Sequence, residues 1–225
     1  MGGLIPLEDV SRRRRHFPIA TVVLIVLNVV VWLLELQGGD SFVYQWAAVP
    51  AYIRSGNGLI TLISSMFLHG SWFHILGNMI FLWAFGPVME DAMNPFSFSL
   101  FYLLGGLVAM LAQVSASASS YIPTLGASGA IAAVMGAFLV TYPRDRIRSI
   151  FFFFLFIRIT YIPAILLIGF WFIMQLVNVG AVANVQHGGV AYIAHVAGFL
   201  FGAATVKIFR RKQPTFATPG PWPRA

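Results

Sequence analysis

The sequence predicts an all-α polytopic membrane protein, a bundle of six transmembrane helices with both termini in the cytoplasm. The first observation is composition: 59% of the 225 residues are apolar and only 9% are charged, whereas soluble domains carry about 25% charged residues. The second is a series of six apolar runs, each near the roughly 20 residues that cross the hydrocarbon core. The third is the position of the basic residues, which cluster beside alternate runs. Lipid is therefore the expected solvent for most of the chain.

The chain divides into three parts. Residues 1–18 form a basic cytoplasmic segment, residues 19–209 the six-helix domain, and residues 210–225 a basic, Pro-rich cytoplasmic tail that is expected to be disordered. The first apolar run, residues 19–36, lacks a small-residue cleavage site, so we expect a transmembrane helix rather than a removable signal peptide. The polar, Gly-rich residues 37–58 are expected to fold on the outer surface.

Five further runs complete the predicted bundle. They cover residues 59–86, 96–114, 126–142, 163–179 and 189–209. Between the fourth and fifth runs, residues 150–161 are strongly aromatic but interrupted by Arg158. We interpret this segment as interfacial, and the alternatives are a lead-in to the fifth helix or a part of it.

Charge placement supports this topology. The net charge is +7, and basic residues cluster at positions 12–15, 144–148 and 207–212. With both termini inside, all three clusters face the cytoplasm, as the positive-inside rule requires, and the outer loops contain only Arg54. Such clusters can also bind nucleic acid. Beside long apolar runs we interpret them as topological signals, and no nucleic-acid partner is expected.

Polar side chains inside the predicted spans are candidates for function, because they are costly in lipid. His69 and His74 lie in the second run and His195 in the sixth. Asn78 follows His74 by one helical turn, and Ser128 opens the fourth run. The acidic residues and lysines lie at span ends or in loops. The polar candidates are therefore histidine, asparagine and serine.

These candidates have similar predicted depths. Counted from the charged residues at the cytoplasmic ends of their spans, Ser128 and His74 lie about 24 Å deep and His195 about 18 Å deep, at about 1.5 Å per residue. All three fall in the outer half of a hydrocarbon core about 30 Å thick. Side chains from three helices can therefore meet there.

The residue types suit acyl transfer. A serine needs an adjacent base, and with no carboxylate or lysine inside a span the sequence leaves a dyad of Ser128 and His195. His74 and Asn78 share one helix face and suit a developing oxyanion, as does the Ser128 N–H at a helix start. Cysteine is absent and no His-Glu-x-x-His motif occurs. Neither a metal nor a cofactor is expected.

Each candidate also has a structural interpretation. Ser128 can be a small residue at a helix crossing, and His195 a histidine bonded to a carbonyl group inside the bundle. The glycines, Gly129 in the fourth run and Gly198 and Gly202 in the sixth, are interpreted as packing positions. They would allow the fourth and sixth helices to approach closely.

Three stretches together resemble a known family, the rhomboid intramembrane serine proteases of bacterial type. They are HGSWFHILGN at residues 69–78, GASG at 126–129 and AHVAGFLFG at 194–202. The resemblance implies a six-span rhomboid bundle in which Ser128 is the nucleophile and His195 the general base. It further implies that His74 and Asn78 stabilise the oxyanion. The motif glycines are Gly126, Gly129, Gly198 and Gly202.

The resemblance also implies substrates and location. Substrates would be transmembrane proteins cut in or near their membrane segments, in the plasma or inner membrane, with the active site open to the outer side. Residues 170–172 become candidates for a lateral gate, and residues 115–120 with His187 for the rim of a water-filled cavity. Ala132 departs from the family, which often has an aromatic there beneath the histidine.

Other classes of membrane protein share some of these features. A catalytically inactive rhomboid-like protein that binds or chaperones membrane proteins has the same fold and is the main alternative. A b-type haem protein could use His74 and His195 as axial ligands and would be coloured when purified. A transporter would call for intramembrane carboxylates or broken helices.

Overall fold

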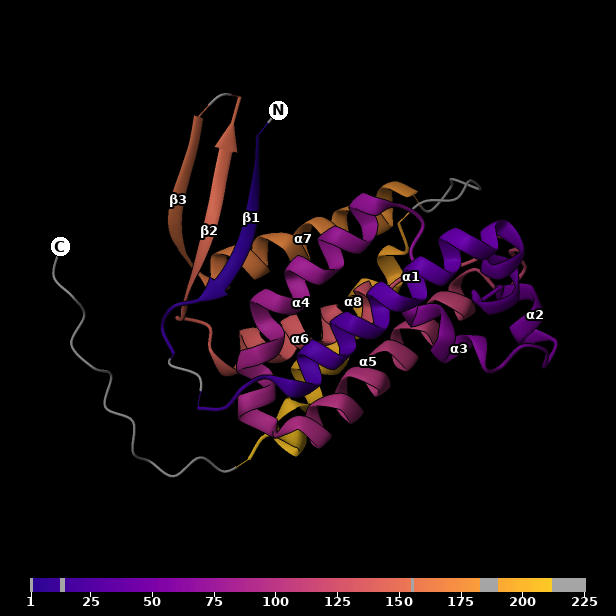
Figure 1. Ribbon diagram of the computed structural model, residues 1–225, viewed down its shortest axis with the longest axis horizontal. Helices are drawn as coiled ribbons and strands as arrows, with labels where there is room; N and C mark the ends of the chain where they lie inside the picture. The colour runs from indigo at the N-terminus through magenta and orange to yellow at the C-terminus, as the bar shows by residue number, and fades with distance from the viewer. Residues whose placement is uncertain (1, 13–14, 155, 183–189, 212–225) are drawn as a thin grey trace, which may run out of the picture.

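The protein is mostly helical (Figure 1), and the computed structural model describes residues 2–12, 15–154, 156–182 and 190–211. The helices are α1 (Ile19–Trp46), α2 (Pro50–Arg54), α3 (Thr61–Ser64), α4 (Trp72–Met93), α5 (Pro95–Ala116), α6 (Ser128–Thr141), α7 (Ala164–Val182) and α8 (Tyr192–Phe209). Among the described residues, α1, α4, α5 and α8 are long and apolar enough to cross a membrane, and α6 and Ala164–Gly180 are shorter apolar helices. The chain is a multi-pass membrane protein.

Two helices have bounds that differ from the apolar runs. Helix α1 continues to Trp46 across a break at Gly39, whose φ of 59° is in the region that glycine adopts without strain. Residues 59–71, predicted to begin the second span, instead form α3, a 3₁₀ turn (Ser65–Phe67) and a loop. Helix α4 begins only at Trp72, because the Ser71 side chain caps it by accepting a hydrogen bond from the His74 N–H at 3.2 Å. His69 therefore precedes the helix.

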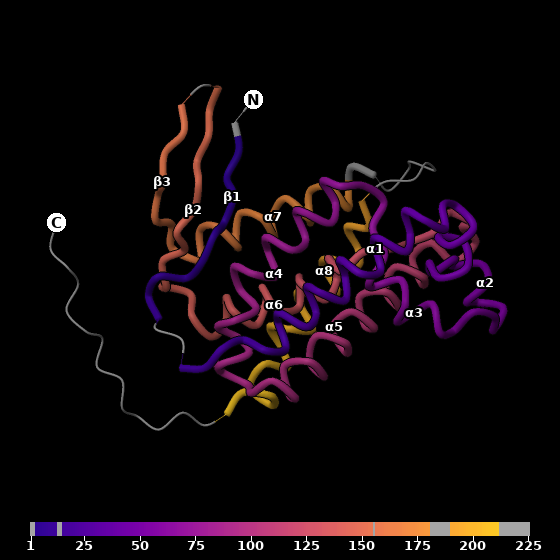
Figure 2. Tube along the Cα trace, in the orientation of Figure 1, coloured from indigo at the N-terminus to yellow at the C-terminus, as the bar shows by residue number. Residues whose placement is uncertain are grey.

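A three-stranded antiparallel sheet corrects the all-helical prediction. Strand β1 (Gly2–Asp9) pairs with β2 (Arg146–Phe153), which pairs with β3 (Phe156–Pro163). The sheet stands beside the helix bundle (Figures 1 and 2), and β1 lies against α4. Residues 150–161 are thus part of a hairpin, and the basic N-terminal segment supplies its third strand.

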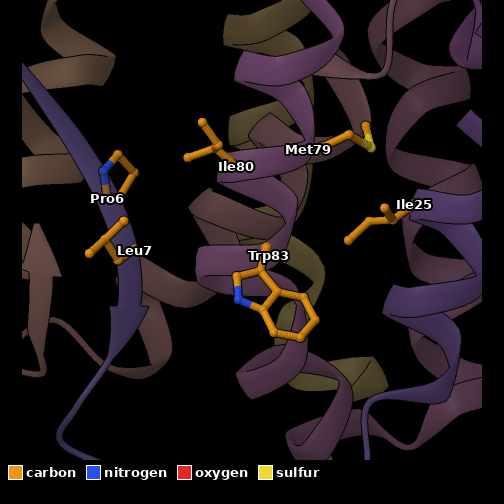
Figure 3. Close-up of a pocket in the computed structure, with 6 residues that line it drawn as sticks. All are labelled: Pro6, Leu7, Ile25, Met79, Ile80 and Trp83. Carbon is orange, nitrogen blue, oxygen red and sulfur yellow. The ribbon is translucent and has the colours of Figure 1, made fainter. Parts of the chain in front are cut away.

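Strand β1 attaches the sheet to the bundle. Pro6 and Leu7 of β1 face Ile80 and Trp83 of α4 across a pocket of about 350 Å³ (Figure 3). Its lining is completed by Ile25 of α1 and by Met79. Every lining side chain is largely apolar, so β1 and α4 present apolar faces to each other here.

Helix α6 forms the centre of the bundle. All of its residues from 129 to 138 are buried, and α4, α5, α7 and α8 pack around it. A helix that is apolar on every side is expected in such a position. Its small side chains, mostly alanine and glycine, leave room for neighbouring backbones.

The sheet end of the bundle gathers the charged segments. Arg12 forms an ion pair with Asp145, just before β2. The backbone N–H of Arg211, after α8, donates to the carbonyl oxygen of Ala92 in α4 at 3.0 Å. Residues near both ends of the described chain therefore lie at one end of the bundle.

The opposite end carries α2, α3 and the loop after α5. Ala48 pairs with Thr124 in an isolated antiparallel bridge, and the Ala51 N–H donates to the Ser120 carbonyl oxygen at 3.0 Å. Helix α6 starts at Ser128, directly after this loop. Ser128 therefore lies toward the end of the bundle opposite the sheet.

Candidate active site

Helices α6 and α8 cross with their backbones in direct contact. A Cβ atom on Gly202 would lie 1.9 Å from the carbonyl oxygen of Ala133, and one on Gly198 would lie 2.2 Å from that of Gly129. Real Cβ atoms do not approach other atoms so closely, so no side chain fits at either position. The glycines expected to be packing positions therefore set the separation of the two helices.

Ser128 and His195 meet at this crossing. Ser128 is the first residue of α6, and His195 lies in the first turn of α8. The Ser128 Oγ is 2.7 Å from the His195 Nε2, within hydrogen-bond distance. The imidazole is buried, with 8% of the residue exposed. The two residues proposed from the sequence as nucleophile and base are in contact.

A glutamine occupies the other side of His195. The His195 Nδ1 lies 2.8 Å from the Oε1 of Gln175, a buried residue of α7. The Nε2 of Gln175 in turn donates to the carbonyl oxygen of Trp171 at 3.1 Å. Gln175 was not identified from the sequence, although the residue lies in the fifth apolar run; the available signal was an amide side chain, one of two in α7 with Asn178.

Aromatic rings from α7 and from α8 itself flank the imidazole. Ala132, where the family often has an aromatic, is fully buried. The Trp171 ring lies 5.8 Å from the His195 ring between centroids, with the planes 36° apart, and Tyr192 lies 6.3 Å away at 89°. Helix α6 therefore has no aromatic ring at position 132 beside His195, and Trp171 of α7, one of residues 170–172, provides a ring contact instead.

His74 presents a hydrogen-bond donor close to Ser128. The His74 Nδ1 accepts a hydrogen bond from the backbone N–H of Gly70 at 3.3 Å. Because a backbone N–H only donates, Nδ1 is unprotonated, and the neutral imidazole carries its proton on Nε2. A Cβ atom on Gly126 would lie 2.9 Å from this Nε2 and 3.7 Å from the Ser128 Oγ. The His74 donor and the serine oxygen therefore border the same small space.

Gly126 is suited to this position by its backbone. Its φ is 127°, which L side chains rarely adopt. The Gly126 N–H donates to the carbonyl oxygen of Ser65 at 2.8 Å, which fixes the loop just before α6. The absence of a side chain leaves the space between His74 and Ser128 open.

Asn78 lies one turn beyond His74 on the same face of α4. It is buried, and its Nδ2 has no hydrogen-bond partner within the part of the chain that the structure describes. Buried donors are rarely left unpaired, because desolvation costs about 1–3 kcal/mol. A residue that stabilises an anion formed only during a reaction is expected to have such an unpaired donor when no substrate is bound.

Glu35 is a buried carboxylate that contacts the loop before α4, although the sequence places it at a span end. Because α1 continues to Trp46, Glu35 is inside that helix and buried, and its Oε2 accepts from the backbone N–H of His69 at 2.9 Å. The His69 ring packs edge-on against the His74 ring, with centroids 5.1 Å apart. Glu35 thus supports the loop before α4, whereas the contact on His195 Nδ1 comes from Gln175.

The remaining predictions concern the cavity rim and the tail. Residues 115–120 lie at the end of α5 and in the following loop, at the Ser128 end of the bundle. His187 and residues 212–225 lie outside the described residues. Within those that are described, no group of three or more potential metal ligands occurs.

Comparisons with known proteins agree on one family. A family model described as "Rhomboid domain" matches residues 56–212. The chain is 30% identical over 199 residues to "Rhomboid protease GluP" of Bacillus subtilis (strain 168), covering 84% of this chain and 35% of that protein. It is 29% identical over 137 residues to "Putative rhomboid protease YdcA" of the same organism, covering 60% of this chain and 68% of that one.

A mitochondrial relative is also similar over a shorter stretch. The chain is 33% identical over 92 residues to "Presenilin-associated rhomboid-like protein, mitochondrial" of Homo sapiens, which is 40% of this chain. The match spans only 24% of that relative's length. The similarity to it therefore concerns part of each protein.

Proposed function

The chain belongs to the rhomboid family, and on this basis we propose that it is an intramembrane serine endopeptidase acting on other membrane proteins. The observation that carries the proposal is the 2.7 Å contact between the Ser128 Oγ and the His195 Nε2. A serine hydroxyl is a weak nucleophile unless a base within hydrogen-bond reach accepts its proton. The proposed dyad has that geometry, with His195 buried and Ser128 half-buried.

In the proposed reaction Ser128 attacks the scissile carbonyl carbon. As the Oγ–C bond forms, His195 Nε2 takes the hydroxyl proton, and the carbonyl oxygen becomes an oxyanion. Collapse of this tetrahedral intermediate breaks the C–N bond, and His195 gives its proton to the leaving amine. Water then attacks the acyl-enzyme with His195 again as base, which releases the second product and restores the Ser128 hydroxyl.

Three donors are available to the oxyanion. The His74 Nε2–H borders the space next to Ser128, the Asn78 amide has an unpaired donor, and the Ser128 N–H at the helix start lacks an intrahelical acceptor. Donors already oriented in a site of low dielectric are the largest contribution in many acyl-transfer enzymes. This supports His74 and Asn78 as stabilising residues.

We further propose six spans with both ends in the cytoplasm. The N-terminal segment, the chain before β2 and the residues after α8 meet at the sheet end, and these segments carry the basic clusters. The positive-inside rule then makes the sheet end cytoplasmic. The Ser128 end, with α2 and Arg54, would face the outer side.

The length of α6 agrees with access from that side. Its 14 residues extend about 21 Å at 1.5 Å per residue, less than the roughly 30 Å of hydrocarbon. A central helix of this length that begins at Ser128 would leave the serine beneath the outer surface. Water could then reach it from outside.

We propose that residues 19–209 form the protease domain. Residues 1–18 would form a cytoplasmic segment that contains β1, and residues 210–225 would form a cytoplasmic tail. We propose the plasma or inner membrane as the location. Transmembrane proteins that unwind easily near the cut are the proposed substrates, because a peptide bond inside a stable helix is shielded.

Labelling with a serine-directed fluorophosphonate tests the proposal. The intact protein should be labelled, and Ser128→Ala and His195→Ala should not. Ser55→Ala, which changes an exposed serine in the turn after α2, should be labelled as fast as the intact protein. Labelling that persists in Ser128→Ala would exclude Ser128 as the nucleophile. A folded intact protein that is never labelled would instead favour the alternative function, an inactive rhomboid-like factor that binds membrane proteins.

A further inference from the structure

Gln175 contacts the ring nitrogen of His195 that faces away from Ser128. We propose that Gln175 is a positioning residue that holds His195 in the tautomer needed for proton transfer, so that α7 controls the competence of the base. The inference rests on the proposed function, because it concerns how the Ser128–His195 pair is kept ready. Three contacts in series, starting from the backbone of α7, support it.

The first contact fixes the orientation of the amide. The Trp171 carbonyl oxygen lies 3.1 Å from one end of the Gln175 side chain. A carbonyl oxygen only accepts hydrogen bonds, so the end that faces it must be the N–H₂ group. The Gln175 Oε1 therefore faces His195.

The second and third contacts fix the proton on the imidazole. The Gln175 Oε1 only accepts, so the His195 Nδ1, 2.8 Å away, must carry the ring proton. A neutral imidazole has one N–H, so Nε2 has a free lone pair. That lone pair faces the Ser128 Oγ at 2.7 Å and can accept its proton. Rotation of the amide by half a turn would remove this tautomer.

A neutral amide is well suited to this place. When Nε2 takes the serine proton, the imidazolium still donates from Nδ1 to the Gln175 carbonyl oxygen, whose dipole favours the positive charge. A carboxylate in the same position would favour it more strongly but would be costly to bury within a membrane bundle. Gln175 thus orients the ring without adding a charge.

Helix α7 also holds the ring from the side. Trp171 and Gln175 are four residues apart and share one helix face, and the Trp171 ring lies against the imidazole. Phe172 stacks on Phe199 of α8, with centroids 4.0 Å apart. If α7 moves away from α8, His195 loses both its hydrogen-bond acceptor and its ring contact. The position of α7 would therefore determine whether the base is active.

The test compares side chains of similar length at position 175. Gln175→Met removes the acceptor, and we expect kcat on a transmembrane substrate in proteoliposomes to fall about 10- to 100-fold with KM within about twofold. Gln175→Glu restores an acceptor oxygen and should recover kcat to within about fivefold of the intact protein. Val177→Ala, at an exposed position of α7, is the control and should leave both constants unchanged.

Nitrogen NMR of the histidine-labelled protein gives a readout that does not depend on activity. His195 should show a protonated Nδ1 in the intact protein and a mixture of tautomers in Gln175→Met. If Gln175→Met is unstable, Gln175→Asn provides the same comparison, because its shorter side chain withdraws the oxygen. The inference is wrong if kcat and the tautomer are unchanged without the acceptor. It is also wrong if a folded Gln175→Glu protein, with the His195 proton on Nδ1, shows no recovery of kcat. An intact protein that fails to react with fluorophosphonate while His195 has the expected tautomer would reject only the proposed function.

Discussion

A Cβ atom on Gly136 would lie 2.1 Å from the carbonyl oxygen of Phe199. This contact continues the row in which Gly198 and Gly202 of α8 touch the backbone of α6. Because the atoms opposite are backbone atoms rather than flexible side chains, an added methyl group can be accommodated only if a helix moves. The distance between Ser128 and His195 depends on the same row.

Gly136→Ala should therefore impair both stability and activity. We expect a lower thermal midpoint and a loss of kcat/KM of at least about 10-fold, because overpacking costs about 1–3 kcal/mol and α8 would carry His195 away from Ser128. Gly169→Ala in α7, where nothing lies within 4 Å of the added atom, is the control and should retain activity. Full activity in Gly136→Ala would show that the helix crossing tolerates displacement.

His74→Ala and Asn78→Ala should each lower kcat by about 10²–10³-fold, the usual cost of losing one oxyanion donor. KM should change much less, because the oxyanion exists only after attack. Steady-state kinetics on a transmembrane substrate provides the measurement. His16→Ala, which removes a histidine whose side chain is 78% exposed, should have no effect. Equal losses in kcat and in thermal stability would instead indicate structural roles for the two residues.

Attachment of β1 should depend on pH through Asp9. Burial raises the pKa of Asp9 from 3.8 to about 7, and the neighbouring Asp145 carboxylate adds to this increase. The hydrogen bond from the Ser11 N–H lowers the pKa but is outweighed. The folded state thus binds more protons than the unfolded state between these values, so stability falls as pH rises from about 4 to 7 and then levels off. A nitroxide label at Leu4→Cys should become more mobile over this range. Adding Asp9→Asn should abolish the change, and an identical pH response in both proteins would contradict the assignment to Asp9.

The exposed apolar residues of the β2–β3 hairpin should contact the membrane interface. Ile157 is 72% exposed, and the sequence has no cysteine, so Ile157→Cys gives a unique site for a nitroxide label. In liposomes, the spin relaxation of this label should be accelerated more by oxygen, which dissolves in lipid, than by a water-soluble nickel complex. Asn57→Cys, at an exposed position toward the other end of the bundle, should show the reverse. A label at position 157 with the accessibility of a fully hydrated site would rule out the interfacial interpretation.

The helical part of the fold could be predicted because it is encoded locally. Apolar runs indicate the helices, and the three motifs by themselves single out Ser128, His195 and His74. Helix ends are predicted less accurately, because Ser71 caps α4 through one side chain and Gly39 allows α1 to continue, and neither effect changes the average hydrophobicity. As a result the sequence places Glu35 at a span end, although it is buried inside α1.

The contacts of His195 are harder to predict. Gln175 has no charge and lies in a different helix, and nothing in the local sequence shows which side of α7 faces α8. Trp171 is grouped with its aromatic neighbours in the sequence, and its contact with the His195 ring depends on how α7 packs against α8. The third strand was missed because β1 pairs with residues far along the chain, so this pairing has no local signature. The β2–β3 hairpin is local, but its aromatic residues were interpreted as an interfacial segment.

The pairing of β1 with β2 also constrains how the protein is made. Residues 2–9 are synthesised before α1, whereas their partner strand is synthesised only after α6. Until β2 is synthesised, the backbone groups of β1 have no partner strand. Contacts of such long sequence separation form slowly. The β1–β2 pairing can therefore form only after the helices that carry Ser128 and His74 have been synthesised.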